Sequence, residues 1–209
     1  MFLILGPALN LLAGFFWESD RQGVTAGTLI VLSTGLWLIG LLGLYDRLRP
    51  LAPRFVAVAV PLAVFATVGG LAFGFQSIYE GMFDVSHAAA VEQLNHYPFT
   101  ANSLYWLAGP MFPLTLFLLG AMLLKLRAAP LPVSVLMMLG AVAFPLSRIT
   151  REPTIAHVAD VLLLLPFLYL AVRSRFPSRP AAEAAKATEL SESDAGRRGL
   201  PLLRRSAPK

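Results

Sequence analysis

Six stretches of apolar residues alternate with shorter polar connections along the chain. They cover residues 2–17, 24–44, 55–79, 102–124, 131–147 and 154–172. An α-helix needs about 20 apolar residues to cross the hydrocarbon core of a bilayer, with a range of about 17–25. The first stretch would extend about 24 Å as a helix, less than the core thickness of about 30 Å. The pattern predicts an all-α, polytopic membrane protein with a six-helix bundle over residues 1–175.

A polar interval at residues 80–100 separates the third apolar stretch from the fourth. It has no lysine or arginine, and its charged and titratable residues are Glu80, Asp84, His87, Glu92 and His96. Ser86 is a favourable N-cap, and Asn95 and Pro98 are typical of a helix end. The interval therefore predicts a short helix from His87 to Leu94 at the outer membrane surface, either as a lid over the bundle or as part of a surface loop.

The composition agrees with a membrane protein, because 56% of the residues are hydrophobic, 14% are charged and the mean hydropathy is +0.67. The net charge of +5 comes from residues 173–209, which contain nine basic and four acidic side chains. This basic segment is a topology signal rather than a nucleic-acid site. Residues 176–209 are predicted to be a disordered cytoplasmic tail. Arg173, Arg175 and Arg179 are predicted to contact anionic lipids.

The lysines and arginines of the connections predict the orientation. One side of the bundle has Arg47, Arg49, Arg54, Lys125 and Arg127, together with the basic tail, whereas the other has Arg21, Arg148 and Arg151. Both termini are therefore predicted to be cytoplasmic, in an inner or plasma membrane. The richness in alanine, leucine and arginine favours a bacterial source. The chain has no cysteine, which excludes disulfides and thiolate chemistry.

Acidic and imidazole side chains gather on the predicted outer side. Seven of the eight acidic residues before the tail lie there or open toward it, and so do the three histidines: Glu18, Asp20, Glu80, Asp84, Glu92, Glu152, Asp160, His87, His96 and His157. An acidic mouth raises the local concentration of cations, which favours a cation, an amine or a proton as the solute. Positive-inside bias alone would also leave acidic residues on this side.

Asp160 is predicted to lie about 10 Å below the outer edge of the sixth helix, where an unpaired carboxylate costs about 2.5 kcal/mol or more. His157 is one helical turn away on the same face. Arg148 and Arg151 are the expected positive partners. The arrangement predicts either a titratable carboxylate in a solute pathway or a structural salt bridge between the last two helices.

Glu80, Asp84 and His87 would share one face if the third helix continued past Tyr79. With His157 they would offer oxygen and nitrogen ligands to a divalent metal. Gly81 interrupts the proposed helix and no tight metal-ligand motif is present, so a solvated helix end is the alternative.

We expect a small transporter or channel-like protein for a cation, proton or small polar solute, without a cofactor and not an enzyme. The residues expected to line its outer cavity are Asp160, His157, Arg148, Arg151 and Glu80. One alternative is a membrane-embedded metal-dependent hydrolase that uses Glu80, Asp84, His87 and His157. The other is a non-catalytic membrane subunit or envelope sensor, and a homo- or hetero-oligomer fits each of these functions. The lipid bilayer is the expected partner.

Overall fold

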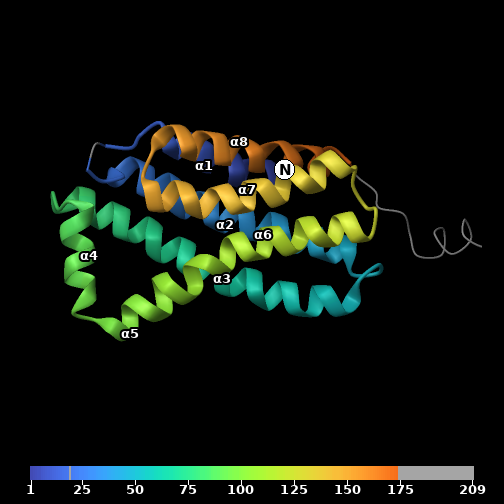
Figure 1. The fold of residues 1–209 in the computed structure, drawn as a ribbon, viewed down its shortest axis with the longest axis horizontal. Coiled ribbons are helices and arrows are strands. Elements are labelled where there is room, and N and C mark those ends of the chain that lie inside the picture. The colour runs from blue at the N-terminus through green and yellow to red at the C-terminus, as the bar shows by residue number, and fades with distance from the viewer. Residues whose placement is uncertain (19, 174–209) are drawn as a thin grey trace, which may run out of the picture. The chain divides into compact units, whose positions relative to one another are not determined.

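The secondary structure is entirely helical in the computed structural model, which describes residues 1–18 and 20–173. The helices are α1 (Phe2–Gly14), α2 (Gly23–Leu48), α3 (Pro53–Met82), α4 (His87–Asn95), α5 (Pro98–Thr100), the π-helix η1 (Ala101–Leu107), α6 (Ala108–Lys125), α7 (Leu131–Thr150) and α8 (Pro153–Val172) (Figure 1). The all-α prediction is confirmed. The predicted tail at residues 176–209, with Arg179, lies outside the described residues, as does Arg175.

Five helical stretches are long and apolar enough to cross a membrane: Gly23–Leu48, Pro53–Met82, Pro98–Lys125, Leu131–Thr150 and Pro153–Val172. The third of these joins α5, η1 and α6 into one continuous run. The helices therefore fit a multi-pass membrane protein. The predicted six-span count is not supported, because the first predicted span corresponds to α1, which has only 13 residues and ends at Gly14 rather than at residue 17.

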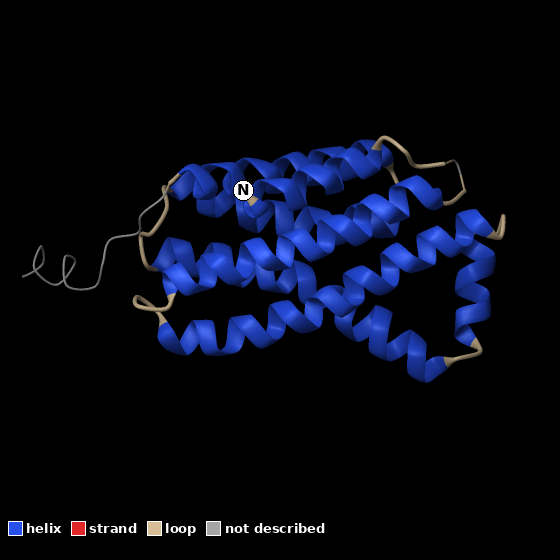
Figure 2. Cartoon of the chain, turned by 180° about the vertical axis from the view of Figure 1, so that it is seen from behind, coloured by secondary structure: helices blue, strands red, loops and turns tan. Residues whose placement is uncertain are grey.

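The six longest elements pack in a closed ring, in the order α1, α2, α3, α6, α7, α8 and back to α1. Small residues allow close approach between neighbours. A Cβ atom on Gly27 of α2 would lie 2.7 Å from the carbonyl oxygen of Gly74 in α3, and one on Gly69 would lie 2.6 Å from the backbone of Ala108. Figure 2 shows the ring from behind, with the described loops at the two ends of the helices.

Large buried side chains fill one half of the ring, which we call the packed end. The core there contains Leu44, Tyr45, Leu48, Leu116, Leu119, Leu123, Met137, Leu163, Phe167 and Leu170. The opposite end, which we call the α4 end, contains α4, the connection from α1 to α2 and the connection from α7 to α8. There α4 runs crosswise to the long helices (Figure 1). Because side chains fill the packed end, any internal space in the ring lies at the α4 end.

The two ends of the bundle also differ in charge. The connections and helix ends at the packed end contain Arg47, Arg49, Arg54, Lys125, Arg127 and Arg173, whereas the α4 end contains Arg21, Arg148 and Arg151. Arg47 fastens α2 to the last helix, because its Nη1 donates to the carbonyl oxygens of Leu170 and Arg173 at 3.5 and 3.4 Å. The basic residues predicted for one side of the membrane therefore lie together at the packed end, and those predicted for the other side lie at the α4 end.

Candidate functional site

A cavity of about 380 Å³ lies inside the ring at the α4 end, between α1, α2, α3, η1, α6 and α7. We call it the central cavity. Its walls are mainly apolar, with Ile30, Trp37, Phe73, Leu104, Phe112 and Phe144 among the lining residues. The polar side chains in the lining include Asn10, Thr34, Gln76, His87, Tyr105 and Arg148. Small-molecule sites in proteins have volumes of about 300–1,000 Å³ and this same mixture of apolar walls and few polar groups.

Arg148, in the last turn of α7, supplies the positive charge in this lining. Its guanidinium carbon lies 5.2 Å from the ring centre of Trp17 and 4.7 Å from that of Phe144, so two aromatic faces hold it. Within residues 1–18 and 20–173 it makes no hydrogen bond or ion pair, although it is close enough to Asp160 to interact electrostatically. The N–H donors of Arg148 are therefore available to a molecule in the cavity.

Asp160 lies in α8 and is only 2% exposed. Its Oδ1 accepts a hydrogen bond of 2.6 Å from Nδ2 of Asn10 in α1, while its Oδ2 has no partner in the described part of the chain. Arg148, one of the two expected positive partners, lies close enough to Asp160 to interact electrostatically, but neither Arg148 nor Arg151 forms an ion pair with it among the described residues. The physical reason is that Arg148 is held between Trp17 and Phe144, and α1, the ring neighbour of α8, presents Asn10 instead.

His157 lies one turn before Asp160 but makes different contacts. Its Nδ1 donates to the carbonyl oxygen of Pro153 at 2.6 Å, and its ring centre lies 4.3 Å from that of Phe15. Its Nε2 is buried without a hydrogen-bond partner among the described residues. His157 is thus packed against the end of α1 near Gly14, outside the lining of the central cavity.

Glu80 is 3% exposed near the C-terminal end of α3. Its Oε1 accepts a hydrogen bond of 2.7 Å from Nε2 of Gln76 and one of 2.8 Å from Nδ1 of His87, the first residue of α4. We call these three residues the Glu80 cluster. Because two neutral or cationic donors converge on one buried carboxylate oxygen, the cluster fastens α4 to α3.

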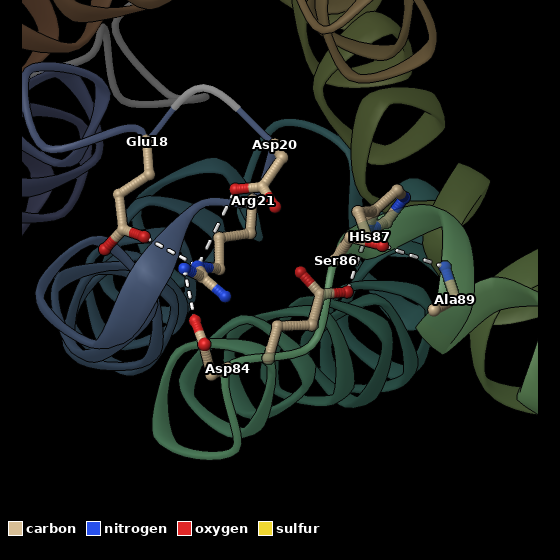
Figure 3. A network of polar contacts seen from close by, with 8 residues as sticks. Glu18, Asp20, Arg21, Asp84, Ser86, His87 and Ala89 are labelled. Carbon is tan, nitrogen blue, oxygen red and sulfur yellow. Dashed lines mark hydrogen bonds and ion pairs between the residues drawn. The ribbon is translucent and has the colours of Figure 1, made fainter.

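Asp84 points away from the Glu80 cluster. The helix α3 ends at Met82, and Asp84 has a φ of 54°, in the left-handed region that few residues other than glycine adopt. Its Oδ1 lies 2.7 Å from Nη2 of Arg21 (Figure 3). The predicted face of Glu80, Asp84 and His87 therefore does not form, because the helix stops before Asp84. In the part of the chain that the structure describes, no group of three His, Asp or Glu side chains is placed to hold a metal ion.

Arg21 is the centre of an acidic surface cluster (Figure 3). Its Nε lies 2.7 Å from Oε2 of Glu18 and 3.7 Å from Oδ1 of Asp20. The hydrogen bond to Glu18, and then the one to Asp84, raise the pKa of Arg21. Three of the acidic side chains that were expected to attract cations are thus neutralised in part by an arginine at the surface.

Arg151 follows α7 and has a φ of 55°. Burial lowers its pKa, and the nearby charges of Glu80 and Asp20 act in the opposite direction. It does not line the central cavity, and it makes no ion pair with Asp160 within the described residues. Arg151 therefore adds positive charge at the α4 end of the bundle without lining the central cavity.

The helix α4 covers the central cavity. It extends from His87 to Asn95, one residue longer than predicted, and Oγ of Ser86 accepts the backbone N–H of Ala89 at 3.3 Å as the predicted N-cap. Val91, Leu94 and Asn95 line the central cavity, yet no residue of α4 is buried. The short helix is confirmed, and its position over the cavity fits a lid.

Sequence reasoning missed the cavity lining formed by Trp37, Phe112 and Phe144, because these residues belong to an ordinary apolar pattern. Asn10, which also lines the cavity, forms a hydrogen bond between helices with Asp160. Comparisons of the chain with protein-family models, with curated proteins and with solved structures give no match.

Proposed function

We propose that the chain is a small multi-pass membrane protein of the transporter or channel type, and that the central cavity binds its solute. The observation that supports this most is the asymmetry of the ring. A cavity of about 380 Å³ lies at one end, while buried leucines and aromatic residues close the other. A carrier or gated pore that is open on one side has this arrangement.

Within this proposal the predicted site residues have different roles. Arg148 contacts the solute, because it lines the cavity and makes no hydrogen bond or ion pair within the described residues. Asp160 and His157 lie behind the wall and position α1 through Asn10 and Phe15. Glu80 holds the covering helix α4 by its bond to His87, and Arg151 attracts negative charge to the mouth.

The lining changes the expected charge of the solute. A cation was expected from the many acidic residues at this end. Among the described residues, however, the central cavity is lined by Arg148 and by no aspartate or glutamate. A solute with an anionic or hydrogen-bond-accepting group is therefore a better fit than a cation.

Charge distribution supports an orientation with the α4 end outside the cell. The packed end has the larger number of lysines and arginines in its connections, which is the cytoplasmic pattern. Exposed apolar side chains on the long helices, such as Leu32, Ile39, Val58 and Leu139, fit contact with lipid. Arg173 at the packed end lies where anionic lipid headgroups would be.

Cysteine labelling tests the transport proposal, because the natural chain has no cysteine. Thr34→Cys places a thiol in the central cavity, and Ser134→Cys places one at a fully buried position of the packed end. A membrane-impermeant thiol reagent is added to right-side-out and inside-out vesicles in parallel.

We expect Thr34→Cys to react from both sides, faster from the side of α4, since a transporter exposes its site alternately. Ser134→Cys should stay unmodified from either side and serves as the control for labelling of buried positions or of unfolded chains. Reaction of Thr34→Cys from the α4 side alone would indicate a receptor, and reaction from neither side would indicate a packed non-catalytic subunit.

A further inference from the structure

We infer that the central cavity binds a single-chain amphiphile with a carboxylate head group, with the head on Arg148 and the apolar chain against Phe144, Phe112 and Trp37. This assignment of the ligand class rests on the proposed function of the cavity. Three features carry it: the free donors of one arginine, a continuous aromatic wall and a second cavity on the outside of the ring.

The head-group position follows from the surroundings of Arg148. The guanidinium carbon lies over the rings of Trp17 and Phe144, and the N–H groups along the edge of the guanidinium have no acceptor among residues 1–18 and 20–173. A carboxylate matches this edge with two parallel hydrogen bonds, and such charged bonds are stronger in a site that excludes water. Asp160 does not take this place, because its Oδ1 is bonded to Asn10 and it does not line the cavity.

The position of the apolar chain follows from a row of aromatic rings that starts at Arg148. The ring centres of Phe144 and Phe112 are 5.2 Å apart, and those of Phe112 and Trp37 are 4.8 Å apart. The row therefore leads from the guanidinium to Trp37, which is 2% exposed. One water molecule takes up roughly 30 Å³ in the liquid, and a methylene group is of similar size. The cavity of about 380 Å³ therefore has room for about a dozen such groups, which is the size of a medium acyl chain.

A second cavity, which we call the lateral cavity, has a volume of about 490 Å³ and is lined by residues of α3, α4 and η1. Gln76, Leu104 and Tyr105 line both cavities and so form the partition between them. Tyr79 and Phe83, in the lining of the lateral cavity, are 55% and 69% exposed. An amphiphile dissolved in the bilayer would thus reach the partition between α3 and the π-helix η1, and π-helical segments are frequent at functional sites.

Fluorescence quenching of Trp37 tests this inference on the full chain in lipid nanodiscs. The chain has three tryptophans, so Trp17→Phe together with Trp106→Phe leaves Trp37 as the reporter, and a phenylalanine at residue 17 keeps a ring beside Arg148. The probe is ω-bromododecanoate, whose bromine quenches on contact. The matched probe is ω-bromododecyltrimethylammonium, which has the same chain and a cationic head.

We expect saturable quenching by ω-bromododecanoate and none that saturates with the ammonium probe. Unlabelled dodecanoate should compete, whereas acetate, which offers the free anion without a chain, should not. Arg148→Gln should weaken the apparent affinity at least tenfold, since a hydrogen bond to a charged group contributes about 1.5–3 kcal/mol. Arg148→Lys should recover part of it, and Arg21→Gln, at the same end but outside the lining, should leave it unchanged.

Equal quenching by both probes, or unchanged affinity in Arg148→Gln, would overturn the inference. Competition by acetate as strong as by dodecanoate would assign the site to a free anion instead. The quenching and cysteine-labelling experiments together distinguish failure of this inference from failure of the transport proposal. Reaction of Thr34→Cys from both sides without saturable quenching leaves a transporter of another solute, and quenching with one-sided reaction leaves a receptor for the amphiphile.

Discussion

The hydrogen bond between Asn10 and Asp160 is a buried polar contact between two helices of the ring, and the two residues are 150 positions apart in the chain. A charged aspartate inside a membrane span costs free energy, and the hydrogen bond from Asn10 to Oδ1 offsets part of that cost. Its second oxygen has no partner within the described residues. Removing the amide of Asn10 should therefore lower the stability of the fold, whereas removing the charge of Asp160 should not lower it.

Asn10→Ala should lower the thermal unfolding midpoint in detergent by about 3–12 °C. This follows from the loss of a bond to a charged group, about 1.5–3 kcal/mol, and from about 2–4 °C per kcal/mol for a chain of this size. Asp160→Asn should keep the midpoint or raise it, because an asparagine still accepts the bond from Asn10 and carries no buried charge. A variant Asn10→Ala as stable as the natural chain would contradict this account of the pair.

At the scale of elements, α4 is the helix with the fewest attachments. None of its residues is buried, and it is held by the Glu80 cluster, by the cap at Ser86 and by a bond of 3.2 Å from the backbone N–H of His87 to the carbonyl oxygen of Asp20. Elements with few buried contacts open locally before the rest of a protein unfolds. Under the proposed function, we therefore expect α4 rather than a ring helix to gate the central cavity.

Glu80→Ala should accelerate hydrogen exchange of the amides in residues 87–95 by about tenfold or more. The change removes the acceptor shared by Gln76 and His87, and a loss of about 1–3 kcal/mol in the closed state corresponds to this factor. Glu92→Ala, on an exposed position of the same helix, is the matched control and should leave the rates nearly unchanged. Equal rates in the two variants would mean that the Glu80 cluster does not hold α4.

At the scale of the whole molecule, the ring is divided between a packed end and a cavity end, and this division coincides with the division of charge. The buried leucine and aromatic core lies beside the connections that contain most of the arginines, whereas the central cavity lies beside the acidic surface cluster around Arg21. If the positive-inside rule applies, the cavity opens away from the cytoplasm.

Single cysteines test this orientation in intact cells. Glu92→Cys in α4 should react with an impermeant maleimide added outside, and Arg49→Cys between α2 and α3 should react only after the membrane is permeabilised. Both positions are exposed, so a difference in labelling reports the side of the membrane rather than burial. The reverse pattern would place the α4 end in the cytoplasm and would require the solute to be taken from there.

The amino-acid sequence by itself determined the helical class, the long apolar helices and the short helix after Ser86, because hydropathy, capping and proline act over a few neighbouring residues. It also determined which connections are basic. Only the tertiary structure decided which side chains meet. Asp84 turned to Arg21 because α3 ends two residues earlier, and Asp160 met Asn10 because the ring closes between α1 and α8. Partners of this kind depend on where helices end and how they rotate against one another, and local patterns do not contain that information.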